Sequence, residues 1–228
     1  MKRLFGIVAF LLPVLVSAGE YSSTTVVQTG VLRESDLIVR NLTDLVSKKT
    51  CLAFYIRTGG TSPVMKCYDA SAGYGGPVTQ VGHIKEDDLV IRKVEDTKNG
   101  FACLAAYVST PGTSPAVDCY SSKVRFKEGM EQTGHLREGD LDIRRVVDSG
   151  SQKTCLIAYV STKGTQPTTI CYDSLGPSPG GLNQTSFLRE GDLVVRKISD
   201  AANRKACMVT YVSTPGTSAH LFCFDENP

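Results

Sequence analysis

The sequence predicts an all-β protein made of four tandem units of about 44 residues, each an antiparallel sheet stapled by one disulfide. The first observation is a repeat: eight cysteines form four pairs 16 residues apart, and the pairs recur every 52 residues. The second is that β-branched, partly alternating segments are separated by turns rich in Gly, Pro and Asp. The third is that no stretch of ten or more residues combines a 3.6-residue apolar period with helix caps.

The first 18 residues predict a secretory signal peptide, residues 1–18. Lys2 and Arg3 precede an apolar run over residues 4–16, and Ser17 and Ala18 supply the small residues of a cleavage site. The run is shorter than the roughly 20 residues of a membrane helix, so we expect no membrane span after its removal. A secreted or periplasmic protein follows from this segment.

The charge balance argues against nucleic acid as a partner. The whole chain carries 25 Lys and Arg against 23 Asp and Glu, and removing Lys2 and Arg3 makes the two signs equal. A protein that binds a phosphate backbone needs a net basic surface, which this composition does not supply.

Aligned at the 52-residue period, the four β repeats span residues 26–69, 78–121, 130–173 and 182–225. The three connecting stretches have unrelated compositions but one length, which predicts that packing between units constrains them. Two arrangements remain open. The units close around an axis as a four-bladed propeller-like assembly, or they remain separate small β modules like beads on a string.

Within a unit, the segments follow one another as strands. A weaker strand at residues 26–32 leads to a turn at 34–36. In the second unit, stronger strands are predicted at residues 89–94 and 103–110. A loop at 110–113 then precedes a short strand at 117–120. Each unit therefore contains three or four short antiparallel strands.

The cysteines are expected to pair within each unit, because an oxidising compartment favours disulfides and this pairing gives every copy the same closed loop. Each bond would contribute about 3 kcal/mol. Zinc is disfavoured by the wide cysteine spacing and by the lack of a His that recurs in all units, so no metal and no cofactor is expected. The expected bonds are Cys51–Cys67, Cys103–Cys119, Cys155–Cys171 and Cys207–Cys223.

Several charged positions also recur. In each unit an Arg stands midway between two Asp residues, as Arg92 does between Asp88 and Asp96. We interpret this Arg as the partner of an acid on a neighbouring strand; a row of Arg side chains exposed to an anionic partner is the alternative. The next position holds Asn41, Lys93, Arg145 or Lys197 and is predicted to face water, since Asn41 also begins a glycosylation sequon. The Leu at positions 37, 89, 141 and 193 is predicted to be buried.

The candidate ligand-binding residues are a recurring Tyr and a Thr-x-Gly-Thr loop. Either the Tyr packs in the core, or it lies exposed beside the loop and forms a binding platform whose four copies give avidity. Turn geometry explains the Gly and Pro of the loop but does not demand its Thr residues. The candidates are Tyr55, Tyr107, Tyr159, Tyr211, Thr58, Thr61, Thr110, Thr113, Thr162, Thr165, Thr214 and Thr217.

No catalytic group is assembled by any motif, with three His in the chain and no nucleophile elbow, so we expect a protein that is not an enzyme. The sequence favours a secreted or periplasmic binding protein that presents four equivalent loops to a repetitive or cell-surface ligand, such as a glycan or a cell-surface protein. A structural spacer and a secreted effector or inhibitor are the alternatives.

Overall fold

The computed structural model describes residues 25–70, 76–122, 129–162, 164–176 and 180–226, and every regular element among them is a strand. The predicted signal peptide lies outside these residues, as do parts of the three connecting stretches. The predicted all-β class is therefore confirmed for the described chain.

Sixteen strands form four antiparallel sheets, each with its strands in chain order. Sheet 1 contains β1 (Val26–Glu34), β2 (Leu37–Asp44), β3 (Lys49–Ile56) and β4 (Val64–Asp69). Sheet 2 contains β5 (Val78–Glu86), β6 (Leu89–Asp96), β7 (Phe101–Val108) and β8 (Ala116–Ser121). Sheet 3 contains β9 (Met130–Glu138), β10 (Leu141–Asp148), β11 (Lys153–Val160) and β12 (Thr168–Asp173). Sheet 4 contains β13 (Leu182–Glu190), β14 (Leu193–Asp200), β15 (Lys205–Val212) and β16 (His220–Asp225).

The turn between the first two strands of each sheet is two residues long, and its first residue has a positive φ. Ser35 and Asp87 adopt φ values of 56° and 54°, and Gly139 and Gly191 values of 64° and 58°. Tight hairpins need this left-handed conformation, which Gly adopts without steric cost and Asp or Ser tolerates. The turn fixes the register of the hairpin, so the same positions face the same way in all four sheets.

All four disulfides join the last two strands of a sheet, as the spacing predicts. Cys103 and Cys119 are direct cross-strand partners of β7 and β8, and their Cα atoms are 4.0 Å apart. The same geometry recurs in the other three sheets. The described residues contain no free cysteine.

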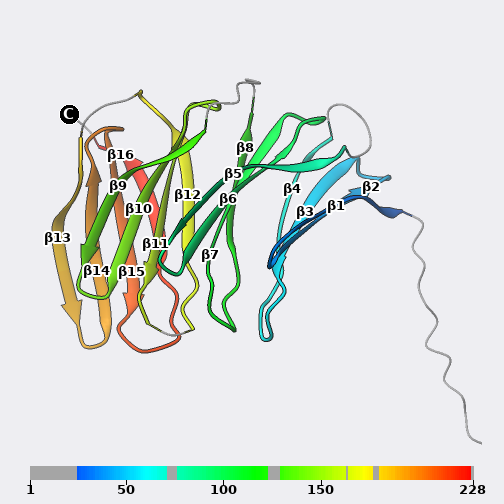
Figure 1. Cartoon of the computed structure of the whole chain (residues 1–228). Coiled ribbons are helices and arrows are strands. Elements are labelled where there is room, and N and C mark those ends of the chain that lie inside the picture. Colours follow the sequence, from blue (N-terminus) through cyan, green and yellow to red (C-terminus); the bar gives the residue numbers. More distant parts are fainter. Residues whose placement is uncertain (1–24, 71–75, 123–128, 163, 177–179, 227–228) are drawn as a thin grey trace, which may run out of the picture.

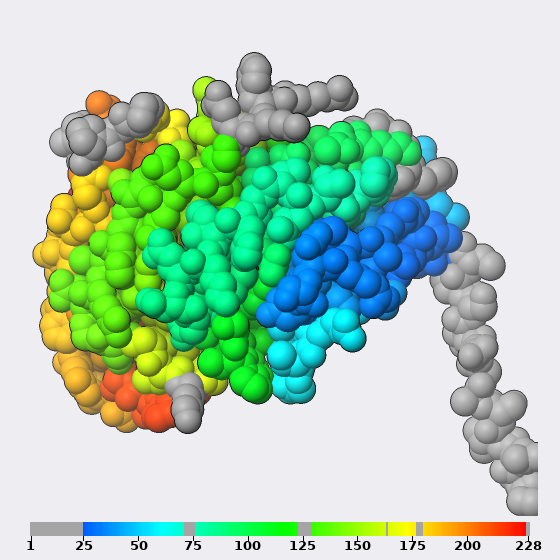
Figure 2. All heavy atoms as spheres, in the orientation of Figure 1, coloured from blue at the N-terminus to red at the C-terminus, as the bar shows by residue number. Residues whose placement is uncertain are grey.

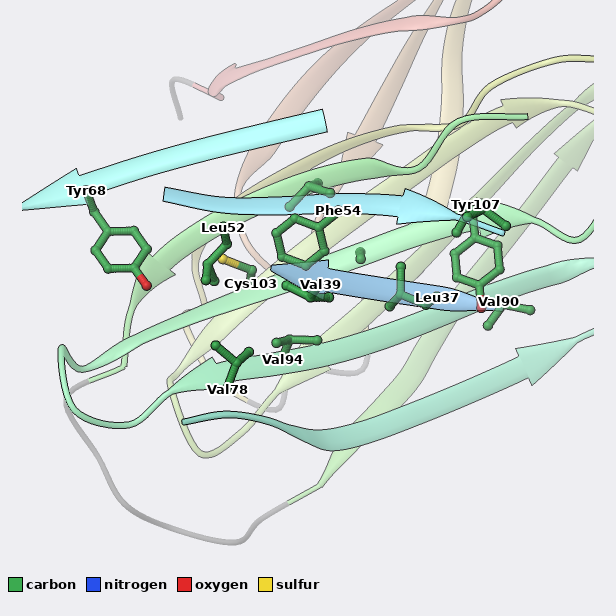
Figure 3. Packing of buried hydrophobic residues seen from close by; sticks show 13 residues of the cluster. Leu37, Val39, Leu52, Phe54, Tyr68, Val78, Val90, Val94, Cys103 and Tyr107 are labelled. Atoms are coloured by element: carbon green, nitrogen blue, oxygen red, sulfur yellow. The ribbon is translucent and has the colours of Figure 1, made fainter. Parts of the chain in front are cut away.

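The sheets stack face to face in chain order, which Figure 1 shows as a row from sheet 1 to sheet 4. Three clusters of buried side chains hold the row together, one between each successive pair of sheets. Figure 3 shows the first of these, with Leu37, Val39 and Phe54 of sheet 1 facing Val90 and Val94 of sheet 2. Strand alternation explains the arrangement: Leu89 and Ile91 of β6 face sheet 3, whereas Val90 and Val94 of the same strand face sheet 1.

The stack is open. Each core cluster joins neighbouring sheets, and among the described residues no such cluster joins sheet 1 to sheet 4. The units are therefore packed, unlike beads on a string, but they do not close into a four-bladed ring. Figure 2 shows sheet 1 (blue to cyan) at one end of the molecule and sheet 4 (orange to red) at the other.

The prediction that the position after the recurring Arg faces water is wrong for sheets 1 to 3. Asn41 is fully buried, and Lys93 and Arg145 are 3% and 4% exposed. The reason is that the strands of an inner sheet are covered on both faces. Lys93 and Arg145 therefore point at the following sheet instead of at solvent. In the folded stack, the Asn41 sequon is closed to a glycan, because the Asn41 amide donates to the Gly76 carbonyl at 3.2 Å.

Candidate interaction surfaces

The recurring Tyr, Arg and Gln belong to one hydrogen-bonded network between sheets. In sheet 2, Arg92 Nε donates to the Tyr107 hydroxyl at 2.9 Å and Arg92 Nη1 donates to Gln80 at 2.7 Å. The Tyr107 hydroxyl in turn donates to Asp36, in the β1–β2 turn of sheet 1, at 2.7 Å. Arg92 thus helps to hold sheet 2 on sheet 1, and its guanidinium pairs with the Asp36 carboxylate of sheet 1 at 3.7 Å.

The same contact joins sheets 3 and 4, where Tyr211 donates to Asp140 at 2.6 Å and Arg196 Nε bonds the Tyr211 hydroxyl at 3.2 Å. The junction of sheets 2 and 3 varies it, because Asp142 occupies a position that is apolar in the other sheets. There, Arg144 pairs with Asp142 on its own strand and with Glu86 of sheet 2.

A second network surrounds the Asp that ends the second strand of sheets 2, 3 and 4. Asp148 of sheet 3 accepts a bond from the Tyr120 hydroxyl at 3.0 Å and pairs with Lys93 Nζ at 2.8 Å, and both partners come from sheet 2. At the next junction, Asp200 accepts a hydrogen bond from the Tyr172 hydroxyl and pairs with Arg145 Nη1, both at 2.6 Å. A buried carboxylate is costly unless it is paired and hydrogen-bonded, so these contacts set how successive sheets align.

Three of the four candidate Tyr residues lie between sheets, and the fourth lies on the outward face of sheet 1. Tyr107, Tyr159 and Tyr211 are buried, and Tyr55, on the outward face of sheet 1, is half-buried. Burial, aided by the charge of Asp142, raises the pKa of Tyr159 to about 12. Of the two interpretations, packing in the core therefore holds for Tyr107, Tyr159 and Tyr211.

The second Thr of each candidate loop closes its own loop. Thr113 Oγ1 donates to the Val108 carbonyl at 2.6 Å and to the Thr110 carbonyl at 2.9 Å. Thr61, Thr165 and Thr217 make the same pair of bonds in their loops. The first Thr, at positions 58, 110, 162 and 214, supplies one of the two carbonyls. Loop closure is thus a structural reason for the recurrence of the second Thr. It does not explain the first, since the Thr58 and Thr162 hydroxyls are buried without a hydrogen-bond partner among the described residues.

The loops adjoin one another at one end of the strands, at the lower edge of the row in Figure 1. The Gly112 amide donates to the Gly59 carbonyl at 3.1 Å, and the Ser62 amide donates to Ser114 Oγ at 2.8 Å. Gly164 also lies close to Gly216 in sheets 3 and 4, where a Cβ at position 164 would come within 3.7 Å of the Gly216 Cα. We call residues 57–63, 109–115 and 213–219, with the described part of 161–167, the loop ridge.

The outward face of sheet 4 exposes large apolar side chains at positions that the other sheets bury or half-bury. Leu37, Leu89 and Leu141 are at most 1% exposed, as predicted, whereas the equivalent Leu193 is 46% exposed, so the prediction of a buried Leu is wrong for sheet 4. Phe222 is 66% exposed. The difference arises because no sheet of the described chain packs on this face. We call Leu188, Leu193, Val212, Phe222 and Phe224 the sheet 4 face.

The outward face of sheet 1 is the opposite end of the stack and has a mixed character. Val26, Val31 and Met65 are exposed, while Arg40, Asp44 and Tyr55 are half-buried. These six residues are called the sheet 1 face. Asp44 accepts bonds only from its own turn among the described residues, from the Ser47 hydroxyl at 2.6 Å and the Val46 amide at 3.0 Å.

A pocket of about 380 Å³ opens between sheets 3 and 4, lined by residues that include Arg145, Gln152, Leu175 and Asn203. Its buried cation, Arg145, is already bonded to Asp200 and to the Gly180 carbonyl. The pocket therefore belongs to the contact between sheets 3 and 4.

In the described chain, no three His, Cys, Asp or Glu side chains are grouped so as to hold a metal ion.

The fold and its surfaces define a class: a disulfide-stapled β-repeat protein whose sheets stack in an open row with two unlike end faces. Protein-family models, curated protein sequences and solved structures were each compared with the chain, and none matches it. The residues described include no helix of the length and apolarity that a membrane crossing requires.

Proposed function

We propose that this protein is a secreted or periplasmic interaction protein without enzymatic activity, and that the sheet 4 face is its principal contact surface. The observation that carries the proposal is the exposure of five large apolar side chains at positions buried or half-buried elsewhere in the stack. Large apolar patches on soluble proteins mark interaction sites, and terminal repeats ordinarily present a polar outer face instead.

The energetics support a role in association. Full burial of a Leu or Phe side chain contributes about 1.5–3 kcal/mol, so covering the five would offset much of the roughly 4–15 kcal/mol cost of rigid-body association. The recurring polar residues are engaged in inter-sheet contacts, which favours binding over catalysis. Four intrachain disulfides are consistent with an extracellular or other oxidising environment.

A photo-crosslinking amino acid at position 222 tests this function. The secreted chain would be irradiated in its native compartment, and a second chain with the probe at position 81 serves as control. Val81 is also an exposed apolar residue, at 47%, but it lies on edge strand β5 away from both end faces. We expect protein adducts from position 222 and few from position 81. Equal or absent adducts would remove the sheet 4 face as the contact surface.

The loop ridge supports a second candidate function, the binding of a repetitive ligand such as a glycan. The observation in its favour is that the loops of sheets 1 and 2 share a backbone hydrogen bond and that Gly164 lies close to Gly216 in sheets 3 and 4, so the sites within each pair adjoin without linkers. Such an array converts several weak contacts into avidity.

A glycan array tests the ridge. A variant with Ser62→Glu, Ser109→Glu and Thr214→Glu alters three exposed ridge positions. A control with Thr97→Glu and Ala201→Glu alters exposed turns at the opposite end of the strands. Binding that only the ridge variant loses supports this function. A blank array with unaltered protein would favour the structural spacer.

A further inference from the structure

The inter-sheet contact is repeated inside the molecule and therefore serves as a template for what the end faces can bind. Two polar links recur where one sheet meets the next, the first at all three junctions and the second at the junctions of sheets 1 and 2 and of sheets 3 and 4. A cation or amide on the second strand reaches the terminal Asp of the following sheet, as Lys93 reaches Asp148. An Asp in the first turn accepts a Tyr hydroxyl from the following sheet, as Asp36 accepts from Tyr107.

The sheet 4 face carries the leading half of both links with nothing to receive them. Lys197 occupies the position of Lys93 and Arg145, and Asp192 occupies that of Asp36 and Asp140. Asp192 is exposed in the β13–β14 turn, and Lys197 has no ion-pair partner among the residues described. Asp192 directly precedes Leu193, and Lys197 lies in the same cross-strand row as Phe222.

The sheet 1 face carries the receiving half. Asp44 occupies the position of Asp148 and Asp200, and Ser47 bonds it as Asn99 bonds Asp96. Tyr55 occupies the position of Tyr107, and Arg40 Nε donates to its hydroxyl at 3.3 Å, as Arg92 does for Tyr107. The exposed Val26, Val31 and Met65 offer apolar surface beside these groups.

We propose that a second copy of this chain docks head to tail, with its sheet 1 face stacked on the sheet 4 face. The proposal rests on the proposed function, in which the sheet 4 face is a contact surface. In this junction, Lys197 of one copy pairs with Asp44 of the next, and Asp192 accepts from Tyr55 beside Arg40. The charges of the two faces are complementary at both links.

Two features shape this junction. Phe224 stands where Tyr68, Tyr120 and Tyr172 supply a hydroxyl, so the junction lacks one hydrogen bond to Asp44 and is weaker than an internal one. The alternative, two sheet 4 faces packed against each other, would leave Asp44, Arg40 and Tyr55 unused. A head-to-tail contact is heterologous, so it continues to further copies unless its rotation closes a ring.

Sedimentation velocity over a concentration series tests the proposal with the secreted chain. The variants are Lys197→Glu, Asp44→Lys and Phe222→Asp, with Val81→Asp as the matched control, and circular dichroism checks the fold of each. We expect the unaltered chain and the control to associate with concentration. Each of the other three variants should weaken association at least about tenfold, because like charges or a buried carboxylate oppose docking.

Mixing two of the variant chains gives the most decisive test. Lys197→Glu and Asp44→Lys chains, each deficient alone, should associate when combined. The new carboxylate at position 197 of one chain then meets the new ammonium at position 44 of the other, so the pair forms with its charges exchanged. Poor folding of either variant cannot produce this rescue. Association of Asp44→Lys like the unaltered chain would indicate sheet 4 faces packed on each other and overturn the proposal, as would failure of the mixture.

The outcome also separates this inference from the proposed function. A chain that stays monomeric up to about 1 mM, the weak end of specific binding, overturns the inference. If position 222 still crosslinks a different protein, the proposed function stands without it. If position 222 crosslinks nothing, both fall. Adducts that join position 222 to a sheet 1 peptide of a second copy support both.

Discussion

The Tyr68 hydroxyl, on the last strand of sheet 1, donates a 2.8 Å hydrogen bond to Asp96, on the second strand of sheet 2. The equivalent Tyr and Asp meet at the next two junctions, at 3.0 Å and 2.6 Å. In sheet 4 the Tyr is replaced by Phe224, on a face that no sheet of the described chain covers. This contact thus marks each internal junction of the stack and is missing at its end.

Tyr120→Phe is expected to destabilise the protein by about 1.5–3 kcal/mol, because it removes a hydrogen bond to the buried carboxylate of Asp148. Denaturant unfolding followed by circular dichroism measures the change. Phe224→Tyr is the reverse change at the equivalent exposed position and should stay within about ±0.5 kcal/mol. A Tyr120→Phe chain as stable as the original would show that the bond is not needed for stacking.

Lys93→Met is expected to cost about 3–5 kcal/mol, because Asp148 then remains buried without its cation. Lys197→Met, measured on the monomer, changes the same repeat position on the outward face of sheet 4, and should cost little. The double variant Lys93→Met with Asp148→Leu should recover most of the loss, since no unpaired charge stays in the core. Equal costs for Lys93→Met and Lys197→Met would contradict the pairing.

Leu89→Ala should cost about 2–5 kcal/mol, whereas Leu193→Ala should cost less than about 1 kcal/mol. The two residues share a repeat position, but Leu89 is 1% exposed and Leu193 is 46% exposed. Thermal unfolding of both variants at low protein concentration checks the difference. Similar shifts would mean that the outward face of sheet 4 is covered within a single chain.

Replacing Cys155 and Cys171 together with Ala should destabilise the protein by about 2–5 kcal/mol, because their bond closes a 16-residue separation in the unfolded chain. Peptide mapping without reduction should recover the four bonds within units and none between them. A peptide that joins Cys119 to Cys155, or a free thiol in the folded protein, would contradict this assignment.

Alkaline pH is expected to unfold the stack through its buried tyrosines. Burial raises the pKa of Tyr120 and Tyr172 far above the ordinary value near 10 and that of Tyr159 to about 12. Because the folded-state pKa is the higher one, the stability from these groups is complete below about pH 10 and is lost as the pH rises through the folded-state values. Tyrosinate absorbance and the β-sheet dichroism should therefore change together. Full tyrosine ionisation near pH 10 with the dichroism retained would contradict the burial.

The burial of charged side chains between sheets could not be predicted from the sequence. The sequence predicts that Lys93 and Arg145 face water, because their repeat position also holds Asn41, which begins a glycosylation sequon. Both are buried, because their charges meet Asp148 and Asp200 of the next sheet, 55 residues further along the chain. A partner so distant cannot be found from local periodicity. The same stacking separates the buried Leu141 from the exposed Leu193, which look identical in sequence.

By itself, the sequence determined the unit: its period, its β strands and its disulfides, because turn chemistry and cysteine spacing act over a few residues and recur in all copies. Only the tertiary structure decided how the units meet. The same hairpins could pack around an axis or in a row, and the choice depends on inter-sheet contacts such as Tyr68 with Asp96, whose partners belong to different units. The open row is also what leaves sheets 1 and 4 each with an outward face, since only the inner sheets can cover both sides.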